Sequence, residues 1–228
     1  MLFKGKKKIT TEQGIFVNNV EIVKTDRAKF LGVIIADNLS WQPHIDYISK
    51  KVSKSIGIMR RLSRYINKAT LISLYYSLIY SYITYCNEVW GLGYASHRRK
   101  LFNLQKRAIR IICNKPKFEH TDPLFKELRI LKLHDINSFL ITNFMFKFYH
   151  NDLPDIFKDM FTYNSSVHSH NTRQNYLLHV PIVQSNLTLM NIRYVGVIKW
   201  NKAAKLLLHN CTIATFKKNL KRTYIDVY

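Results

Sequence analysis

The feature that most constrains the fold is a stripe of apolar residues spaced three and four apart. Its members are Ile45, Ile48, Val52, Ile56, Met59, Leu62 and Ile66. Such spacing places them all on one side of an α-helix, and that side must pack against other elements. The pair Asp37-Asn38 predicts a turn before this helix, and Ser40 is its expected cap.

Basic residues lie on the opposite side of the same helix. At about 100° per residue, four of them fall within a narrow arc. These four are Lys50, Lys54, Arg61 and Arg64. A solvated helix face usually mixes both signs, yet no acid occurs between Ser49 and Ile66. A ridge of one sign favours contact with a phosphate backbone over a role in solubility alone.

The whole chain is strongly basic. Its 228 residues include 36 Lys and Arg against 14 Asp and Glu, a formal net charge of +22. Apolar residues make up 47% of the chain, which is enough for a packed core. Because like charges repel one another in a compact fold, we expect a polyanionic partner. Nucleic acid is the first candidate, an anionic membrane surface the second, and a basic protein without such a partner the simplest alternative.

The first 36 residues are expected to form β-structure. Apolar runs on both sides of Asn18-Asn19 predict a hairpin, because Asn tolerates the positive φ angles of a two-residue turn. The run KFLGVII over residues 29–35 predicts a third strand. Within it, Gly32 indicates either a bulge or a place where another backbone comes close.

Most of the remaining chain is predicted to be helical. Asn67 is the expected cap of a buried helix that runs to about Trp90, and its tyrosines are expected in the core rather than stacked on bases. A third helix, capped by Ser96, repeats the pattern of the first. Its apolar stripe is Leu101, Leu104, Ala108, Ile111 and Ile112, and its basic side is Arg99, Lys106 and Arg110.

These elements predict a mainly α protein with a small N-terminal antiparallel β-hairpin or sheet (α+β). Three parts are expected: residues 1–36 as the β-hairpin and strand, 37–118 as a helical bundle, and 119–228 as a mostly helical extension. Residues 117–160 are expected to be helical again up to Pro154, residues 161–195 are expected to form a polar loop or exposed strands, and further helices follow. The apolar run over residues 71–86 is interrupted by Ser and Thr and is too short for a membrane span.

No arrangement of residues indicates a catalytic or metal site. The chain has no Asp-Asp pair, no Gly-rich phosphate loop and no His-Glu-x-x-His motif. His168, His170 and His179 are expected on the surface rather than as metal ligands, because no Cys or acid lies at a matching spacing. We therefore assign no catalytic residue, no metal site and no cofactor.

The cysteines indicate a reducing, intracellular setting. Cys86, Cys113 and Cys211 form no Cys-x-x-Cys pair, which argues against a disulfide framework and a zinc site. Cys113 with His120 has the residue types of a thiol nucleophile. Because Cys113 falls on the apolar side of its helix, an inert buried thiol is the better interpretation.

Several blocks of the sequence, taken in order, resemble the C-terminal part of reverse transcriptases from non-LTR retrotransposons of the jockey and LINE-like types. The similarity covers roughly residues 15–175. The blocks are KFLGVIIADNLSWQPHIDYISKKVSKSIGIMRRL, LYYSLIYSYITYCNEVWG, LFNLQKRAIRIIC, HTDPLFKELRILKL and NTR.

This resemblance implies roles for the predicted parts. The residues that correspond to the family's primer-grip strand, which presses the primer end toward the active site, are Lys29, Phe30, Leu31 and Gly32. Residues 1–36 would derive from the palm and 37–118 would form the thumb. The two basic helix sides would then lie along the phosphates of a template–primer duplex, and the expected partner is RNA–DNA or DNA duplex, or element RNA.

The family's catalytic aspartates, which lie in the palm, have no counterpart in the chain. We therefore expect a truncated fragment that is inactive as a polymerase alone, with magnesium implied only for the missing palm. The alternatives are a protein-interaction module, with a partner on the surface that the missing palm would leave, and activity restored by a separate palm. No membrane partner is expected, and the expected location is the nucleus or the cytoplasm.

Overall fold

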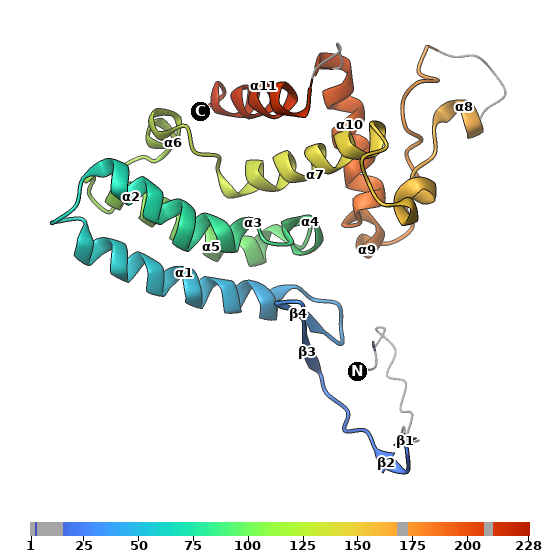
Figure 1. Ribbon diagram of the computed structural model, residues 1–228, viewed down its shortest axis with the longest axis horizontal. Helices are drawn as coiled ribbons and strands as arrows, with labels where there is room; N and C mark the ends of the chain where they lie inside the picture. Colours follow the sequence, from blue (N-terminus) through green and yellow to red (C-terminus); the bar gives the residue numbers. More distant parts are fainter. Residues whose placement is uncertain (1–2, 4–15, 168–172, 208–211) are drawn as a thin grey trace.

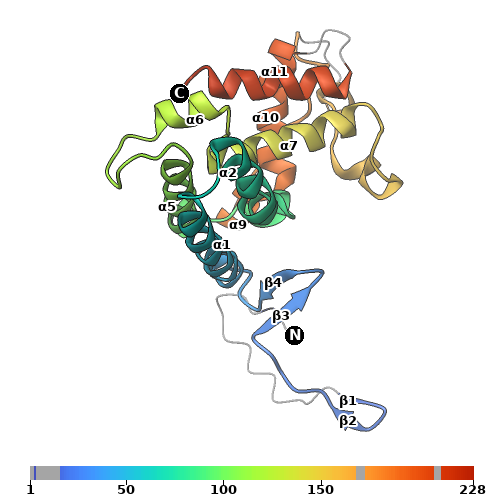
Figure 2. The same cartoon turned by 60° about the vertical axis from the view of Figure 1, so that its left-hand side comes forward.

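The computed structural model describes residues 3, 16–167, 173–207 and 212–228. It is mainly helical and carries two small antiparallel β-ribbons near its N-terminus, which confirms the predicted class. Both ribbons lie at one end of the first long helix, and the second ribbon packs against that end (Figures 1 and 2).

The elements are arranged along the chain in a simple order. The strands are β1 (Phe16–Val17), β2 (Val20–Glu21), β3 (Arg27–Phe30) and β4 (Val33–Ala36). The helices of the N-terminal half are α1 (Gln42–Leu62), α2 (Lys68–Tyr75), the π-helix η1 (Tyr76–Tyr80), α3 (Ser81–Thr84), α4 (Asn87–Trp90) and α5 (Ala95–Ile112). The later helices are α6 (Asp122–Leu128), α7 (Leu133–Tyr149), the 3-10 helix η2 (Asp155–Met160), α8 (Asn164–Val167), α9 (Asn186–Leu189), α10 (Ile192–Leu207) and α11 (Ile213–Ile225).

The first ribbon agrees with the sequence prediction and the second does not. Asn18 and Asn19 have φ angles of 49° and 62° and join β1 to β2 as a two-residue turn. The expected third strand is instead a second hairpin, in which Leu31 (φ 44°) and Gly32 (φ 81°) join β3 to β4. Gly32 is therefore a turn residue and not a bulge, so that prediction was wrong.

Helix α1 buries the predicted apolar stripe through most of its length. Five members, from Ile45 to Met59, are buried, whereas Leu62 is exposed and Ile66 lies beyond the helix end. The cap position is Trp41 rather than Ser40, although the Ser40 hydroxyl accepts a hydrogen bond from the Gln42 N–H at 3.3 Å.

The second predicted helix is divided into several segments. Asn67 caps it as expected, since its side-chain oxygen accepts a hydrogen bond from the Thr70 N–H at 2.8 Å. The Ser81 N–H bonds to the Tyr76 carbonyl five residues earlier, which defines a π-helical turn inside the run. Cys86, with φ 48°, then breaks the helix before α4.

The tyrosines of this region divide between core and surface. Tyr75 is fully buried, and Tyr80 and Tyr82 are half-buried. Tyr76 and Tyr85 are exposed, so the prediction that the tyrosines pack in the core holds for three of the five.

Helix α5 begins one residue earlier than its predicted cap. Tyr94 occupies the cap position, which leaves Ser96 inside the helix and makes that prediction wrong. The helix packs along α1, and α2 and η1 cover the same core (Figures 1 and 2). Helix α7 lies between this group and the C-terminal helices α10 and α11, with which it shares a second core around Phe146, Trp200 and Phe216.

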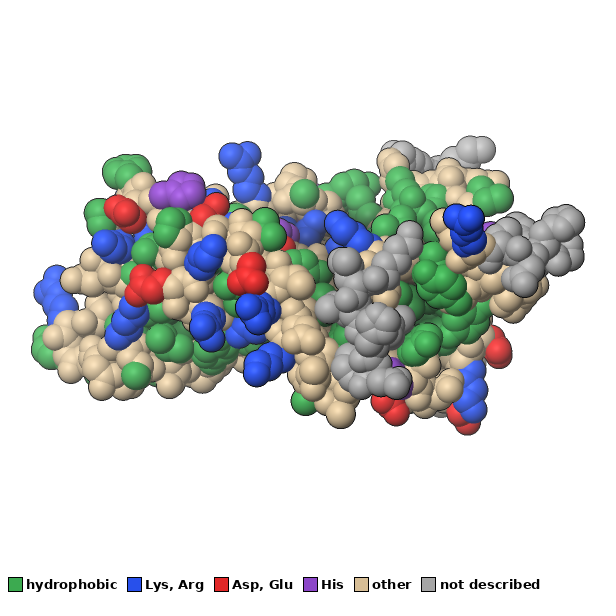
Figure 3. Space-filling view, turned by 90° about the horizontal axis from the view of Figure 1, so that it is seen from above, with side chains coloured by type: hydrophobic (Ala, Val, Ile, Leu, Met, Phe, Trp, Pro, Cys, Tyr) green, Lys and Arg blue, Asp and Glu red, His purple; other side chains and the backbone are tan. Residues whose placement is uncertain are grey.

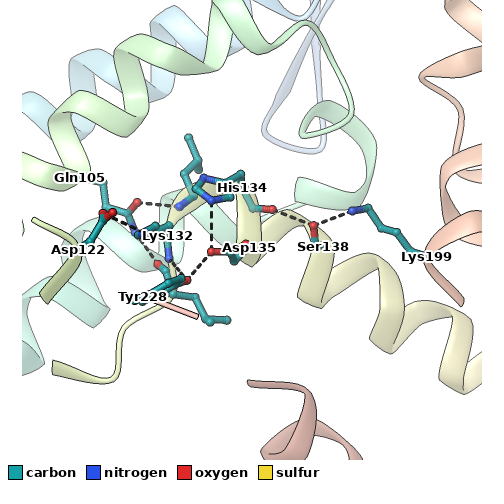
Figure 4. Close-up of polar contacts among 10 residues, drawn as sticks. Gln105, Asp122, Lys132, His134, Asp135, Ser138, Lys199 and Tyr228 are labelled. Atoms are coloured by element: carbon teal, nitrogen blue, oxygen red, sulfur yellow. Dashed lines mark hydrogen bonds and ion pairs between the residues drawn. The ribbon is translucent and has the colours of Figure 1, made fainter. Parts of the chain in front are cut away.

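A buried polar junction joins these layers (Figure 4). The Gln105 amide donates to the Tyr75 hydroxyl and the Leu131 carbonyl, each at 2.9 Å, and its oxygen accepts from the Leu133 N–H at 2.8 Å. Nearby, the Lys132 ammonium lies 2.9 Å from an Asp122 carboxylate oxygen.

Tyr228, at the end of the chain, belongs to the same polar junction. The Tyr228 hydroxyl accepts a hydrogen bond from the Lys132 N–H at 3.0 Å and donates one to the Asp135 carboxylate. The Lys132 ammonium also lies 4.0 Å from the centre of the Tyr228 ring. Burial and the bond to Asp135 raise the pKa of Tyr228 well above its ordinary value, so the hydroxyl remains a donor.

Candidate nucleic-acid interface

The outer face of α1 carries the predicted basic ridge. Lys50, Lys54 and Arg61 are exposed on the helix, and Arg64 is exposed in the turn after it. Because the apolar stripe of α1 faces the core, these cations lie on the side turned away from it. The placement agrees with the sequence prediction for all four residues.

The outer face of α5 agrees with the prediction only in part. Arg99 is exposed, as predicted. Lys106 is half-buried, with its ammonium 4.5 Å from the centre of the Phe102 ring. Arg110 is also half-buried, and its Nε donates to the Glu119 carbonyl at 2.9 Å. Lys106 and Arg110 are held by local partners. Of the three predicted cations on α5, Arg99 is therefore the one that is exposed and able to contact a ligand.

Four further exposed cations were missed from the sequence. They are Lys51 and Arg60 on α1, and Lys100 and Arg107 on α5. The prediction considered only a narrow arc of each helix, whereas the structure exposes side chains over a wider sector. The signal that could have found them is composition, since α5 contains six cations and no acid.

The two adjacent helices therefore carry charge of almost one sign. Helix α1 contributes five cations and the single acid Asp46, and α5 contributes six cations and no acid, which gives eleven against one. The Asp46 carboxylate accepts a hydrogen bond from Gln42 at 2.9 Å and pairs with Lys100 at 3.1 Å. The bond from Gln42 and the charge of Lys100 lower the pKa of Asp46, so it is ionised at neutral pH and offsets only one cation.

The face on the other side of the molecule has a different character. In the view from above, over α6 and α11, acidic and basic side chains lie among one another (Figure 3). On α11, the Arg222 guanidinium lies 3.5 Å from an Asp226 carboxylate oxygen. The strong excess of basic over acidic side chains therefore belongs to α1 and α5 and not to the face over α6 and α11.

The β3–β4 ribbon is attached directly to the start of the ridge. Val33 and Ala36 of β4 are buried, and the Ile34 N–H donates to the Nδ1 atom of His44 at 3.2 Å. On the outer side, the ammonium groups of Lys29 and Lys51 lie 5.5 and 5.8 Å from the centre of the Tyr47 ring. The ribbon thereby adds its own cation to the basic face of α1.

The tip of the ribbon is held from a different helix segment. The Tyr85 hydroxyl donates to the Leu31 carbonyl at 2.7 Å, and a Cβ on Gly32 would lie 3.3 Å from the Tyr85 ring. The close neighbour of Gly32 is therefore a side chain and not another backbone. Phe30 and Leu31 remain 64% and 73% exposed, so the tip of the ribbon presents apolar groups outward.

The sequence also raised the questions of a metal site, a membrane span and reactive cysteines. No group of three or more His, Cys, Asp or Glu side chains that could hold a metal ion occurs among the described residues. Within the same residues no helix is long and apolar enough to cross a membrane. Cys86 and Cys113 are free thiols, and burial raises the pKa of Cys113. His168, His170 and Cys211 lie outside the described residues.

The fold and the surface define a mainly helical module with a basic two-helix face and a β-ribbon at one end of that face. Over 125 residues the chain is 26% identical to the RNA-directed DNA polymerase from mobile element jockey of Drosophila melanogaster, and equally to that of Drosophila funebris. Over 129 residues it is 22% identical to the probable RNA-directed DNA polymerase from transposon X-element of Drosophila melanogaster. These similarities relate it to the reverse transcriptases of non-LTR retrotransposons.

The aligned stretches are short compared with the relatives. They cover 54–55% of this chain but 14% of each polymerase. No protein-family model and no solved structure matches the chain.

Proposed function

We propose that this chain is a reverse-transcriptase-derived module that binds a template–primer duplex along the outer faces of α1 and α5. The observation that carries the proposal is that two adjacent helices expose eight of their eleven cations and contain the single acid Asp46. A face of this kind repels itself and binds a polyanion strongly. The similarity to RNA-directed DNA polymerases supports nucleic acid as that polyanion.

The dimensions of the face fit a duplex. Helix α1 has 21 residues and is therefore about 32 Å long at 1.5 Å per residue. That length matches about nine base pairs at 3.4 Å each. Lys50, Lys54 and Arg61 recur along it on one side, so they can contact successive phosphates without reading base edges.

The β3–β4 ribbon completes the proposal at the start of α1. The resemblance to a primer grip concerns Lys29 to Gly32, and these residues lie at the end of the basic face with Phe30 and Leu31 exposed. We propose that Lys29 contacts the terminal phosphates of the primer and that the apolar tip packs against its last sugar and base.

Salt dependence tests the duplex proposal. Affinity for a fluorescent duplex, measured by anisotropy from about 50 to 300 mM salt, should give a steep log–log slope because phosphate contacts release counterions. A variant with Gln at positions Lys50, Lys54, Arg61 and Arg64 should lower that slope by about 0.9 for each lost DNA phosphate contact.

A charge-matched variant provides the control. It carries Gln at four cations on the later helices, all exposed: Lys147, Lys202, Lys217 and Lys218. Both variants lose four charges, so a general charge effect would change their slopes equally. Equal slopes, or a flat plot for the unmodified protein, would contradict binding at the α1–α5 face.

Exposed apolar groups on the first ribbon and in the segment after it favour a second candidate function, which is association with another copy of the chain. Val20 and Val23 are 68% and 85% exposed, and Phe16 is 62% exposed. Both ribbons are two-stranded within the described residues, so their edges are available for pairing. Light scattering should then show a dimer that the substitutions Val20→Thr and Val23→Lys convert to a monomer. A monomeric unmodified protein would exclude this candidate.

A further inference from the structure

A large hollow lies at the end of α1 that is remote from the β3–β4 ribbon. Its volume is about 1070 Å³, and it is bordered by the end of α1, the turn into α2 and the end of α5. Ligand-binding clefts typically measure about 300–1,000 Å³, so this hollow is large enough for more than one nucleotide. Its position beyond Arg61 makes it a continuation of the basic face.

Three arginines line this hollow, and they are not neutralised by their surroundings. Arg60, Arg61 and Arg64 are exposed, and none forms an ion pair with an acid in the described part of the chain. The remaining cation at the rim, Lys68, is paired with Glu127. Guanidinium groups bind phosphate oxygens in a two-pronged geometry, so three of them in one hollow favour a phosphate-bearing ligand.

An aromatic ring stands beside these arginines. Tyr65 lies in the turn after α1, lines the hollow and is 84% exposed. Its backbone is held in that turn, because the Tyr65 N–H bonds to the Leu62 carbonyl at 2.8 Å. The ring thus has a fixed backbone and an open face, which is the arrangement of a stacking platform for a base.

We propose that this hollow binds unpaired nucleotides that extend from the duplex, with Tyr65 stacked on a base and the three arginines on its flanking phosphates. The inference rests on the proposed function, because the duplex on α1 delivers the single strand to the hollow. A duplex alone does not explain the ring, since paired bases offer their faces to a protein only at the duplex end.

The test compares a blunt duplex of about ten base pairs with the same duplex carrying an extension of about four unpaired nucleotides. The extension should strengthen binding by about ten-fold in anisotropy titrations, which is the usual effect of stacking one base. Tyr65→Ala should abolish this gain and leave blunt-duplex affinity within about two-fold. Tyr65→Phe should retain the gain, because the ring is preserved.

Tyr176→Ala serves as the matched control, since Tyr176 is 61% exposed and lies in a later loop. It should leave the gain unchanged. An equal affinity for blunt and extended duplexes, or a gain that survives Tyr65→Ala, would overturn the single-strand site while leaving the duplex proposal standing. Absence of binding by every probe would overturn both proposals.

Discussion

At the junction between the β3–β4 ribbon and α1, one buried histidine links two elements. His44 is 2% exposed, and its Nδ1 accepts a hydrogen bond from the Ile34 N–H. An acceptor nitrogen carries no proton, so the ring is neutral when the ribbon is seated. Burial accordingly lowers the pKa of His44 from 6.5 to about 4.

This histidine makes stability dependent on pH. Below about pH 6.5 the unfolded chain takes up a proton at His44 that the folded chain does not accept until about pH 4. Stability should therefore fall as the pH drops through this window, by about 2 kcal/mol between pH 7 and 5. The measurement is urea unfolding of the protein and of His44→Gln at both pH values. The stability difference between the two should shift by that amount, and a difference independent of pH would contradict the assignment.

The turn of the second ribbon depends on a residue without a side chain. Gly32 has φ +81°, and a Cβ there would lie 3.3 Å from the Tyr85 ring. Gly32→Ala should weaken the β3–β4 ribbon by about 1–2 kcal/mol, because L-residues are strained at this φ. Hydrogen exchange of the β3 and β4 amides would measure the loss locally.

Gly57 offers the opposite case in the same protein. It lies on the exposed side of α1, and a Cβ there would meet nothing within 4 Å. Gly57→Ala should therefore stabilise the protein by about 1 kcal/mol, since alanine is the better helix former. A similar loss of stability from Gly32→Ala and Gly57→Ala would show that the turn between β3 and β4 does not specifically require glycine.

At the scale of elements, Gln105 joins α5 to the start of α7. Its side chain is fully buried and makes bonds to Tyr75, Leu131 and Leu133. Gln105→Leu keeps the volume but leaves these three polar groups without their partner. The expected cost is about 3 kcal/mol or more in urea unfolding. Gln184→Leu, at an exposed position, should cost little, and equal effects would contradict this account.

The elements also show what the sequence could and could not predict. Helix α1 was predictable from its apolar period, and the cap at Asn67 from the chemistry of that side chain. The division of residues 27–36 into two strands could not be predicted, because it depends on Leu31 at φ 44° and on a hydrogen bond from Tyr85, 54 residues away. Local propensity contains no information about such a distant bond.

The residues of the candidate site also divide into those whose exposure the sequence could predict and those whose exposure it could not. Exposure of Lys50, Lys54, Arg61, Arg64 and Arg99 was predictable from helical spacing. The half-burial of Lys106 and Arg110 was not, because it arises from a neighbouring ring on the same helix and from a carbonyl in a loop. Tyr65 was missed since a lone aromatic residue in a turn forms no pattern.

At the scale of the whole molecule, the net charge of +22 should oppose compaction. Raising the salt concentration from about 0.05 to 0.5 M shortens the Debye length and screens this repulsion. We expect the midpoint of thermal unfolding to rise with salt. The variant with Gln at Lys50, Lys54, Arg61 and Arg64 should show a smaller rise, and a midpoint that falls with salt would contradict a repulsion-limited fold.

The π-helical turn at Tyr76–Tyr80 accommodates more residues than an α-helical turn would, and this sets the rotational phase of the helix beyond it. Deletion of one residue there would rotate every later side chain of the segment by about 100°. The Tyr85 hydroxyl would then point away from Leu31, and the tip of the β3–β4 ribbon would lose this hydrogen bond. A single extra residue in one helix thus helps to hold the tip of a hairpin that lies much earlier in the chain.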